Sequence, residues 1–419
     1  MSRFVALDGN GAVAEAMRQI NPDVVAAYPI TPSTAIPQAF SQYVADGLVD
    51  TEFVPVESEH SALSACIGAA AAGGRMMTAT SSNGLAVMWE MLYIAASFRL
   101  PIVMTNVNRT LSGPINIHCD HGDSMGARDA GWIQLYSENA QEAYENTLQA
   151  IRIAEHTDVR LPVMVMQDGF ITSHTMERVA IHNDDDVIGF LGEYRPLYPL
   201  LDTENPVTYG AYDLAEYYFE HKRSQIEGMY QAPRVIQEVG AEFGRRFGRT
   251  YGLFDAYGMD GAQVAIVVLS STAGTARYAM EKMRGKGIRA GLIKPRVFRP
   301  FPAQELVDAL QNVHAVAVMD RSVSPGSMSC GGPLWLELLA AAQLYQLNVP
   351  IVDYVSGLGG REIKPGHIEG IYGDLVQIAE TGEIARGVVF LDVRGEEHQS
   401  AAPHNGRHGA VINSITREK

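Results

Sequence analysis

The chain has 419 residues, of which 47% are hydrophobic, 8% aromatic and 19% charged, a globular mixture too long for one ordinary core. Its 48 acidic against 32 basic residues leave a formal net charge of −16, which gives no sign of the basic surface that nucleic-acid binding needs. No window approaches about 18 uninterrupted apolar residues, and the N-terminus lacks a charged-then-apolar leader. We therefore expect a cytoplasmic protein without a membrane span.

The first half of the chain alternates short apolar strands with helices of small residues. The pattern predicts strands over residues 23–30, 51–58, 75–82, 100–109 and 161–169, and helices over residues 60–73, 84–99 and 139–157. These strands lack a clean alternation of polar and apolar positions, which indicates a parallel sheet covered by helices on both faces.

From about Asp184 to Arg246 the pattern breaks down into a Pro-, Tyr- and Asp-rich excursion and a helix that leads to a boundary near residue 250. A second α/β series follows, with strands predicted over residues 262–271, 288–296, 314–322 and 350–358 and helices over residues 275–287, 303–313 and 333–347. We predict an α/β protein of two domains, residues 1–250 and 251–395, and a polar tail over residues 396–419 that lacks an apolar period.

Cysteine and histidine spacing predicts neither disulfides nor a metal site. Cys66, Cys119 and Cys330 are far apart with no C-x-x-C pair, which argues against disulfides and against a four-cysteine iron–sulfur or zinc site on this chain. The histidines include no H-E-x-x-H pattern.

Two glycine-rich stretches give only weak evidence for dinucleotide binding. "GNGAVAEA", from Gly9, nearly matches the dinucleotide-binding fingerprint, but its third glycine is replaced by Ala14. We favour a helix start with small packing residues, and we interpret "SGLGGRE" as a loop after a strand.

Two prolines in "AAYPITPST" bracket Thr31 at the end of a predicted strand. Proline removes a backbone donor and pushes the preceding residue out of helical geometry. The segment is either a simple strand-to-helix turn or a device that holds Thr31 at a fixed place and angle.

Two glutamates lie where a strand turns into a helix in "VPVESEHSAL". Glu57 and Glu59 are favoured at a helix N-terminus by capping and dipole effects. The following helix is built of very small residues, so a carboxylate at its mouth would be partly desolvated and suited to proton transfer. Both interpretations remain open on composition alone.

A long polar loop follows the strand 100–109, and loops of this kind at strand ends are where ligands usually bind. Arg109 could present a forked cation to a carboxylate ligand. On the residues alone, a salt bridge to Asp120 or Asp123 is the favoured interpretation.

An ordered set of motifs supports a family resemblance over roughly residues 5–395. "YPITPST", "VESEHSA", "TSSNGLAVMWE", "RLPIVMTNVNRTLSGPINIHCDHGDSMGARDAGWIQ", "QDGFITSH", "KPRVFRPFP" and "SGLGGRE" together resemble the alpha subunit of the pyruvate:ferredoxin oxidoreductases, a 2-oxoacid:ferredoxin oxidoreductase family. The resemblance implies an N-terminal pyrimidine-binding thiamine diphosphate domain and a second domain like the C-terminal domain of transketolase.

The resemblance also implies an activity and site residues. The reaction is oxidative decarboxylation of a 2-oxoacid such as pyruvate with coenzyme A to acyl-CoA and carbon dioxide, with electrons passing to ferredoxin, or the reverse synthesis. Glu59 would bind the pyrimidine ring nitrogen of thiamine diphosphate and drive proton loss from the thiazolium carbon. Thr31 would donate its hydroxyl to the oxoacid, and Arg109 would face the substrate carboxylate.

Other parts of the active complex are expected on partner subunits. Thiamine enzymes hold magnesium and diphosphate with a G-D-G…N segment, and the nearest stretch here, "QDGF…HN" from Gln167 to Asn183, differs from it. We expect a beta subunit to carry that site, and ferredoxin-like gamma and delta subunits to carry [4Fe–4S] clusters, with an active site at the interface.

Substrate identity rests on few residues. Thr31 fits a pyruvate-type pocket, whereas the stretch from Ser327, "SMSCGGPLWLELLAA", looks somewhat like the second domain of the oxalate enzyme. Oxalate or another small 2-oxoacid is therefore an alternative substrate, and a non-catalytic scaffold subunit is the alternative from another class.

Overall fold

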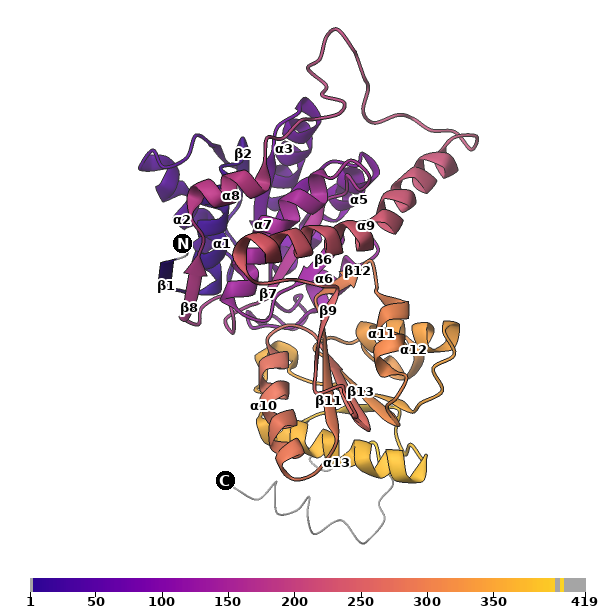
Figure 1. The fold of residues 1–419 in the computed structure, drawn as a ribbon. Coiled ribbons are helices and arrows are strands. Elements are labelled where there is room, and N and C mark those ends of the chain that lie inside the picture. The colour runs from indigo at the N-terminus through magenta and orange to yellow at the C-terminus, as the bar shows by residue number, and fades with distance from the viewer. Residues whose placement is uncertain (1–2, 396–399, 403–419) are drawn as a thin grey trace. The chain divides into compact units, whose positions relative to one another are not determined.

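A computed structural model describes residues 3–395 and 400–402 of the chain, so most of the predicted polar tail lies outside the described residues. The chain divides into two compact units (Figure 1). Unit 1 comprises Met1–Leu253 and Val297–Pro300, and unit 2 comprises Phe254–Arg296 and Phe301–Lys419. The chain thus returns to unit 1 for one short segment after entering unit 2.

Unit 1 is built on a seven-stranded sheet of order β12-β6-β7-β5-β4-β2-β3. All neighbouring pairs in it are parallel except β12 with β6, and β1 pairs with β8 in a separate antiparallel ribbon. The strands of unit 1 are β1 (Arg3–Leu7), β2 (Val24–Ala27), β3 (Glu52–Pro55), β4 (Met76–Thr80), β5 (Ile102–Asn108), β6 (Ile133–Tyr136), β7 (Val163–Asp168), β8 (Glu177–Ile181) and β12 (Val297–Arg299). The predicted parallel sheet is therefore confirmed, with one antiparallel edge strand.

Helices surround this sheet, as the sequence pattern predicts (Figure 1). They are α1 (Gly9–Ile20), α2 (Ala35–Ala45), α3 (Glu59–Ala72), α4 (Ser82–Val87), α5 (Trp89–Ser97), α6 (Gly122–Gly126), α7 (Ala140–Glu155), α8 (Asp184–Leu191) and α9 (Tyr218–Phe247). Every residue of β5 and β7 is buried, which explains why these strands have no alternating polar face. Full burial of each large aliphatic side chain contributes about 1.5–3 kcal/mol.

Capping side chains start several of the helices that follow strands in unit 1. The Asp8 carboxylate accepts the backbone N–H of Gly11 at 2.7 Å to start α1, and Ser58 caps α3 in the same way. Such caps contribute about 1 kcal/mol each. The single helix predicted over residues 84–99 is wrong, because the chain breaks at the buried Met88 into α4 and α5.

Unit 2 is a second α/β unit with a six-stranded sheet of order β15-β14-β13-β10-β11-β9, parallel except for β9. Its strands are β9 (Phe254–Tyr257), β10 (Val264–Val268), β11 (Ala290–Pro295), β13 (Ala315–Asp320), β14 (Ile351–Val355) and β15 (Val388–Phe390). Its helices are α10 (Thr272–Gly285), α11 (Ala303–Leu310), α12 (Pro333–Leu344) and α13 (Pro365–Thr381), with short 3₁₀ turns η1 (Met328–Cys330) and η2 (Leu358–Gly360). The core lies between this sheet and the helices α10 and α13.

Two buried carboxylates organise the start of α12. Asp320 accepts the backbone N–H groups of Leu334 and Trp335 at 3.2 and 2.9 Å, and Asp353 accepts that of Gly332 at 2.7 Å. A Cβ on Gly332 would lie 2.1 Å from Asp320 Cγ, so only glycine fits there. Burial, with the nearby charge of Asp320, raises the pKa of Asp353 well above its usual range.

Among the described residues, the structure contains no helix that combines the length and the apolar character needed to cross a membrane.

Candidate active site

The three residues predicted for the site all follow strands of the unit 1 sheet. Thr31 lies in the turn after β2, Glu59 is the first residue of α3 after β3, and Arg109 follows β5 directly. Strands β2, β3, β4 and β5 run parallel. Their carboxyl ends therefore meet at one edge of the sheet, where open α/β sheets bind ligands.

Arg109 and Thr31 are in direct contact. The buried Arg109 guanidinium donates through Nη1 to the Thr31 carbonyl at 2.9 Å and through Nε to the Asn116 carbonyl at 3.2 Å. The salt bridge favoured from the residues alone is wrong, because Asp123 accepts the Arg109 backbone N–H at 3.1 Å rather than its guanidinium. Thr31 itself is exposed, so its hydroxyl can reach a ligand at this edge.

Asp123, at the start of α6, anchors the polar loop that carries Arg109. Its buried carboxylate accepts the backbone N–H groups of Ser82, Arg109 and Ser124 and the side-chain amides of Asn106 and Asn108, at 2.7–3.1 Å. Burial raises the pKa of Asp123, and these hydrogen bonds oppose that shift. The sequence gives little warning of this role, since the five donors come from three separate segments.

Glu59 lies in a narrow, largely dry position. Its side chain is 7% exposed and has no hydrogen-bond partner among the described residues. Gly84 of α4 lies beside it, because a Cβ at Gly84 would come within 2.7 Å of Glu59 Oε1 and 2.5 Å of Thr80 Oγ1. The Thr80 hydroxyl is fully buried and also has no partner in the described part of the chain. A carboxylate and a hydroxyl donor thus face the same small space.

Helix α4 links this carboxylate to the loop of Arg109. Asn83 donates through Nδ2 to Ser112 Oγ at 2.5 Å and accepts the Ser112 backbone N–H at 3.1 Å. Ser82 donates to the Thr110 carbonyl. Thr31 and Arg109 are therefore joined directly, and Glu59 is joined to them through α4.

The glycine stretch at residue 9 supports the same edge of the sheet. Asn10 donates to the Pro32 carbonyl at 2.9 Å and accepts from Gln167 Nε2 at 3.0 Å, so it holds the turn that contains Thr31. Gly9 allows this approach, since a Cβ there would lie 2.0 Å from Gln167 Oε1. The helix-start interpretation is confirmed. The supporting roles of Asn10 and Gln167 were missed, and only their glycine-rich neighbourhood signalled them.

A buried cysteine, histidine and aspartate also come together near this loop. The ligand-type atoms of Cys119, His121 and Asp168 lie within 4.8 Å of one another. His121 Nε2 contacts Asp168 Oδ1 at 2.8 Å, and both side chains are buried. The spacing of residues in the sequence does not predict this group, because Asp168 ends β7 whereas Cys119 and His121 lie in the loop before α6.

A separate surface depression of unit 1 includes none of Thr31, Glu59 and Arg109. It is lined by Phe4, Asn139, Gln141, Glu142, Glu177, Arg178, Arg249 and Tyr251. We place the site at the sheet edge rather than here, because the buried Glu59 and the buried, unpartnered hydroxyl of Thr80 lie at that edge.

Fold and geometry together define a class: α/β proteins with parallel sheets that present buried polar groups at the carboxyl ends of their strands for a small ligand. Comparisons with known proteins narrow this class. The family model described as pyruvate flavodoxin/ferredoxin oxidoreductase, thiamine diphosphate-binding, matches residues 15–241. The model of the pyruvate:ferredoxin oxidoreductase core domain II matches residues 262–368.

Similar curated proteins match nearly the whole chain. The pyruvate synthase subunit PorA of Thermotoga maritima is 54% identical over 372 residues, covering 89% of this chain and 94% of that protein. The ketoisovalerate oxidoreductase subunit VorA of Pyrococcus abyssi is 42% identical over 391 residues, covering 93% and 97%. The chain belongs to the pyruvate flavodoxin/ferredoxin oxidoreductase family.

Two solved structures share the fold. The 2-oxoglutarate:ferredoxin oxidoreductase from Magnetococcus marinus matches 89% of this chain with a TM-score of 0.68 at 20% identity, and the match spans 65% of that longer chain. A split-gene transketolase in an inactive tetramer matches 88% of this chain and 94% of its own with a TM-score of 0.50 at 13% identity. The predicted family resemblance and the thiamine-enzyme fold class are confirmed.

Proposed function

We propose that this chain is the alpha subunit of a thiamine-diphosphate-dependent 2-oxoacid:ferredoxin oxidoreductase that acts on pyruvate with coenzyme A, in either direction. The single observation that carries the proposal is the position of Glu59. It is a buried carboxylate that has no hydrogen-bond partner among residues 3–395 and 400–402, at the carboxyl edge of a sheet in a thiamine diphosphate-binding family. Residues 1–250 would form the pyrimidine-binding domain, and residues 251–395 the transketolase-like domain.

The residues around Glu59 fit an aminopyrimidine ring. A carboxylate accepts hydrogen bonds and can exchange a proton with a ring nitrogen, and the unpartnered Thr80 hydroxyl supplies a donor beside it. Gly84 keeps the space between them free of a side chain. When bound, thiamine diphosphate supplies the carbanion and the electron sink that decarboxylation requires. Glu59 would exchange a proton with the pyrimidine ring nitrogen, and this exchange would activate the cofactor.

Thr31 and Arg109 would bind and orient the oxoacid. A fixed guanidinium neutralises a carboxylate, and two carbonyl contacts hold that of Arg109 in place. The exposed Thr31 side chain would donate its hydroxyl to the substrate. Preorganised donors of this kind contribute more than mobile ones because they need no ordering when the substrate binds.

The partner subunits complete the proposal. Magnesium with the diphosphate site would be supplied by a beta subunit and the [4Fe–4S] clusters by ferredoxin-like gamma and delta subunits. Residues Gln167 and Asp168 support this division, because both are buried and bonded within unit 1, to Asn10 and His121.

The test replaces Glu59 in the assembled complex. We expect Glu59→Gln to lower pyruvate-dependent reduction of a low-potential dye by about 10²–10⁴-fold, the usual contribution of a proton-transferring group. Glu57→Gln is the matched control, because that exposed glutamate lies in the same turn. Unchanged activity of Glu59→Gln, with thiamine diphosphate bound as tightly as by the wild type, would refute the assignment.

Substrate choice needs its own measurement. We expect the wild type to prefer pyruvate over oxalate and 2-ketoisovalerate in kcat/KM, and Thr31→Val to lower kcat/KM for pyruvate about 10–100-fold. A wild-type preference for oxalate or ketoisovalerate would move the assignment to that alternative. No turnover with any 2-oxoacid by the complete complex would favour the scaffold alternative.

A further inference from the structure

The longest irregular segment of unit 1 lies between α8 and α9. Residues 192–217 contain no helix or strand. Compact domains seldom carry an unstructured loop longer than about 12–15 residues unless it has a function. Figure 1 shows this segment and the start of α9 extending from the rest of unit 1. We call residues 192–230 the arm.

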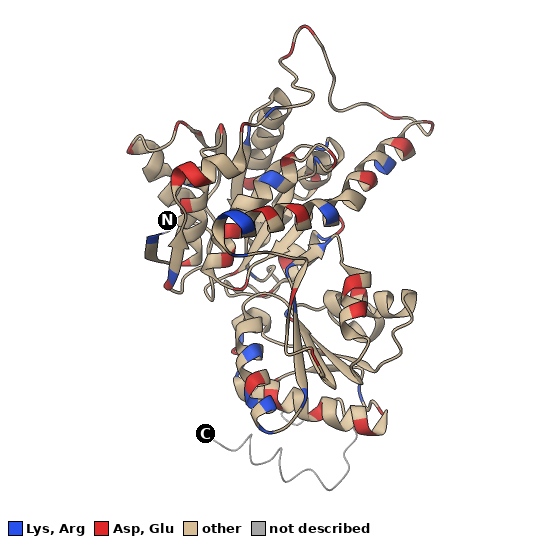
Figure 2. Ribbon diagram, viewed as in Figure 1, with Lys and Arg blue, Asp and Glu red and all other residues tan. Residues whose placement is uncertain are grey.

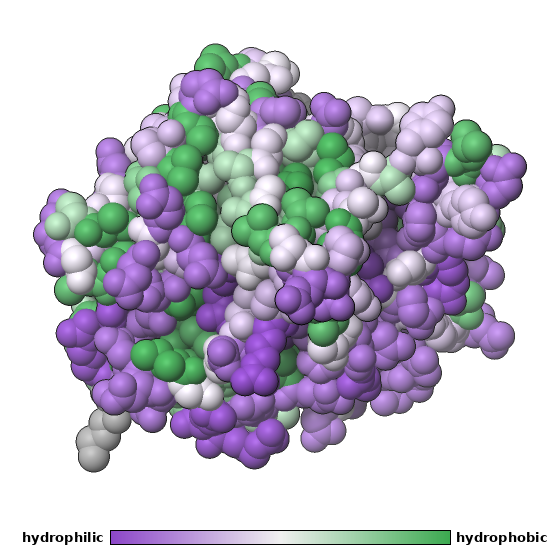
Figure 3. Space-filling model, turned by 90° about the horizontal axis from the view of Figure 1, so that it is seen from above, coloured by the Kyte–Doolittle hydropathy of each residue, from purple (hydrophilic) through white to green (hydrophobic). Residues whose placement is uncertain are grey.

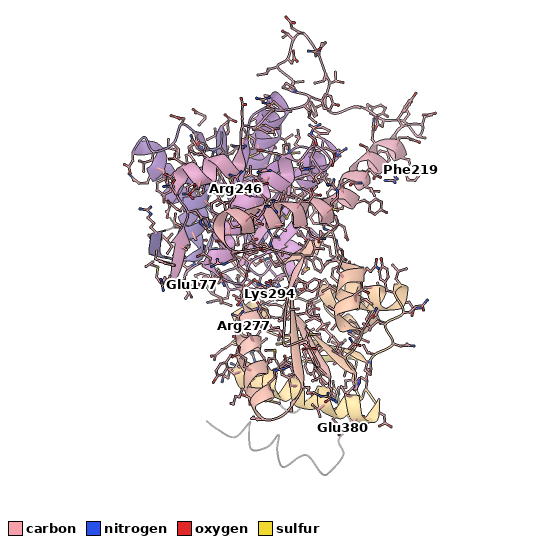
Figure 4. All side chains as sticks on the ribbon, viewed as in Figure 1. Glu177, Phe219, Arg246, Arg277, Lys294 and Glu380 are labelled. Atoms are coloured by element: carbon pink, nitrogen blue, oxygen red, sulfur yellow. The ribbon has the colours of Figure 1, made fainter. Side chains whose placement is uncertain are left out.

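The root of the arm is packed and its tip is not. Leu200 donates its backbone N–H to the Ala71 carbonyl at 2.7 Å, and the Tyr209 ring lies 5.7 Å from that of Phe98. Among the described residues, the rings of Tyr212, Tyr217, Tyr218 and Phe219 have no aromatic-ring contact, and the ring of Tyr230 contacts only the guanidinium of Arg223 in the same helix. Figure 4 labels Phe219 near the free end of α9.

The tip exposes an unusual amount of apolar surface. Its large hydrophobic side chains are between 58% and 92% exposed, namely Tyr212, Leu214, Tyr217, Tyr218 and Phe219. At about 200 Å² for each complete side chain, they expose roughly 700 Å². That area approaches the ~800 Å² per partner of a standard interface. Figure 3 shows green hydrophobic residues among purple hydrophilic ones on the face seen from above.

The charge of the tip indicates the charge of the surface that it would bind. Residues 211–220 contain Asp213, Glu216 and Glu220 and no lysine or arginine, whereas Lys222 and Arg223 follow on α9. Asp213 pairs with His221 within the arm, so the exposed acidic side chains of the tip are Glu216 and Glu220, and Figure 2 shows acidic positions along the arm. A second copy of this chain would bring a net charge of −16 toward the acidic tip. Electrostatic complementarity instead favours a basic surface.

The arm is remote from the candidate active site. Its root contacts Ala71 and Gly73 at the end of α3, whereas Glu59 begins the same helix. At about 1.5 Å per residue the two ends of α3 are roughly 20 Å apart. The surface at the arm is therefore separate from the one at which a partner would complete the cofactor site.

We infer that the tip of the arm, residues 211–220, docks into an apolar pocket rimmed by lysine or arginine on a different polypeptide of the assembly. Tyr212 and Phe219 are the anchors, since large, exposed aromatic side chains supply most of the energy of such contacts. The exposed acidic side chains of the tip set orientation and rate of association. This inference does not depend on the chemistry proposed for Glu59.

The test uses the assembly purified through a tag on this chain. The photo-crosslinking variant Phe219→p-benzoylphenylalanine is compared with Tyr278→p-benzoylphenylalanine on α10, a tyrosine that is 59% exposed. We expect position 219 to crosslink to one segment of a partner chain that contains lysine or arginine. Crosslinks to a second copy of this chain, or no more than at position 278, would overturn the inference.

The second part of the experiment measures affinity. The double variant Tyr212→Ala, Phe219→Ala should weaken association with the crosslinked partner by at least about tenfold, measured by titration of purified subunits. Glu216→Lys with Glu220→Lys should weaken it most at low salt, because both glutamates are exposed and screening reduces charge attraction. Dye-reduction activity at saturating partner should stay unchanged. Wild-type affinity in the aromatic double variant, with an unchanged thermal unfolding midpoint, would also overturn the inference.

Discussion

Gly84 offers a way to move the Glu59 carboxylate without removing it. In Gly84→Ala the new Cβ would lie 2.7 Å from Glu59 Oε1, 2.9 Å from Glu59 Cγ and 2.5 Å from Thr80 Oγ1. Ordinary carbon contacts begin near 3.5 Å, so the carboxylate must shift by roughly 1 Å. A misplacement of this size can cost about 10²-fold in rate.

The stability change should be smaller than the activity change. Overpacking costs about 1–3 kcal/mol, and replacing a helical glycine by alanine returns about 1 kcal/mol. We therefore expect a net loss of about 0–2 kcal/mol in the free energy of unfolding. The loss of kcat/KM, about 100-fold, corresponds to about 2.7 kcal/mol in activation free energy.

The assay combines steady-state kinetics of the complex, titration with thiamine diphosphate and thermal unfolding of the chain. Gly68→Ala is the control, because this exposed glycine of α3 has no heavy atom near its new Cβ, so alanine should stabilise the helix slightly and leave activity unchanged. Activity within about twofold of wild type in Gly84→Ala would refute the placement of Glu59, since a 1 Å shift of a catalytic group cannot be neutral.

Two further predictions concern charge. Arg109→Lys loses the planar fork that contacts the carbonyl of Thr31, so KM for pyruvate should rise about 10–100-fold with a smaller change in kcat; an unchanged KM would remove Arg109 from the substrate site. In unit 2, the pKa of Asp353 is raised above its usual range, so its stabilising contribution is present below the ordinary carboxyl pKa and is lost as pH rises through the raised value. Asp353→Asn should therefore gain stability relative to wild type as the pH rises above the ordinary carboxyl pKa, measured by urea unfolding, whereas the exposed control Asp308→Asn should not. A difference independent of pH would contradict this reasoning.

Local patterns in the sequence were enough to predict the strands that precede the three candidate site residues. The apolar runs before Thr31, Glu59 and Arg109 are short and bounded by Pro, Ser and polar residues, so their strand character is a local property. Parallel pairing then follows from the alternation of strands with helices, and it brings the ends of those strands to one edge. The motif resemblance implied the reaction, and the roles of Thr31, Glu59 and Arg109 remain predictions.

Contacts between residues that lie far apart in the chain could not be predicted from local patterns. Arg109 contacts the Thr31 carbonyl, and Asn10 contacts Gln167, across separations that no periodic pattern encodes. The return of β12 to the edge of the unit 1 sheet beside β6 was likewise missed, because its pairing depends on residues far along the chain. The break at Met88 depends on burial against the rest of the unit rather than on helix propensity.

The sequence by itself determined the alternation of strands and helices, the family and the chemical identity of the site residues, because these depend on local periodicity and residue type. Tertiary structure decided that Glu59 is buried beside Gly84 and Thr80, that Asp123 gathers five hydrogen bonds around the Arg109 loop, and that this chain's own described residues leave the tip of the arm exposed. Burial and hydrogen-bond partnership are properties of the whole fold, since each depends on atoms brought together from separate strands.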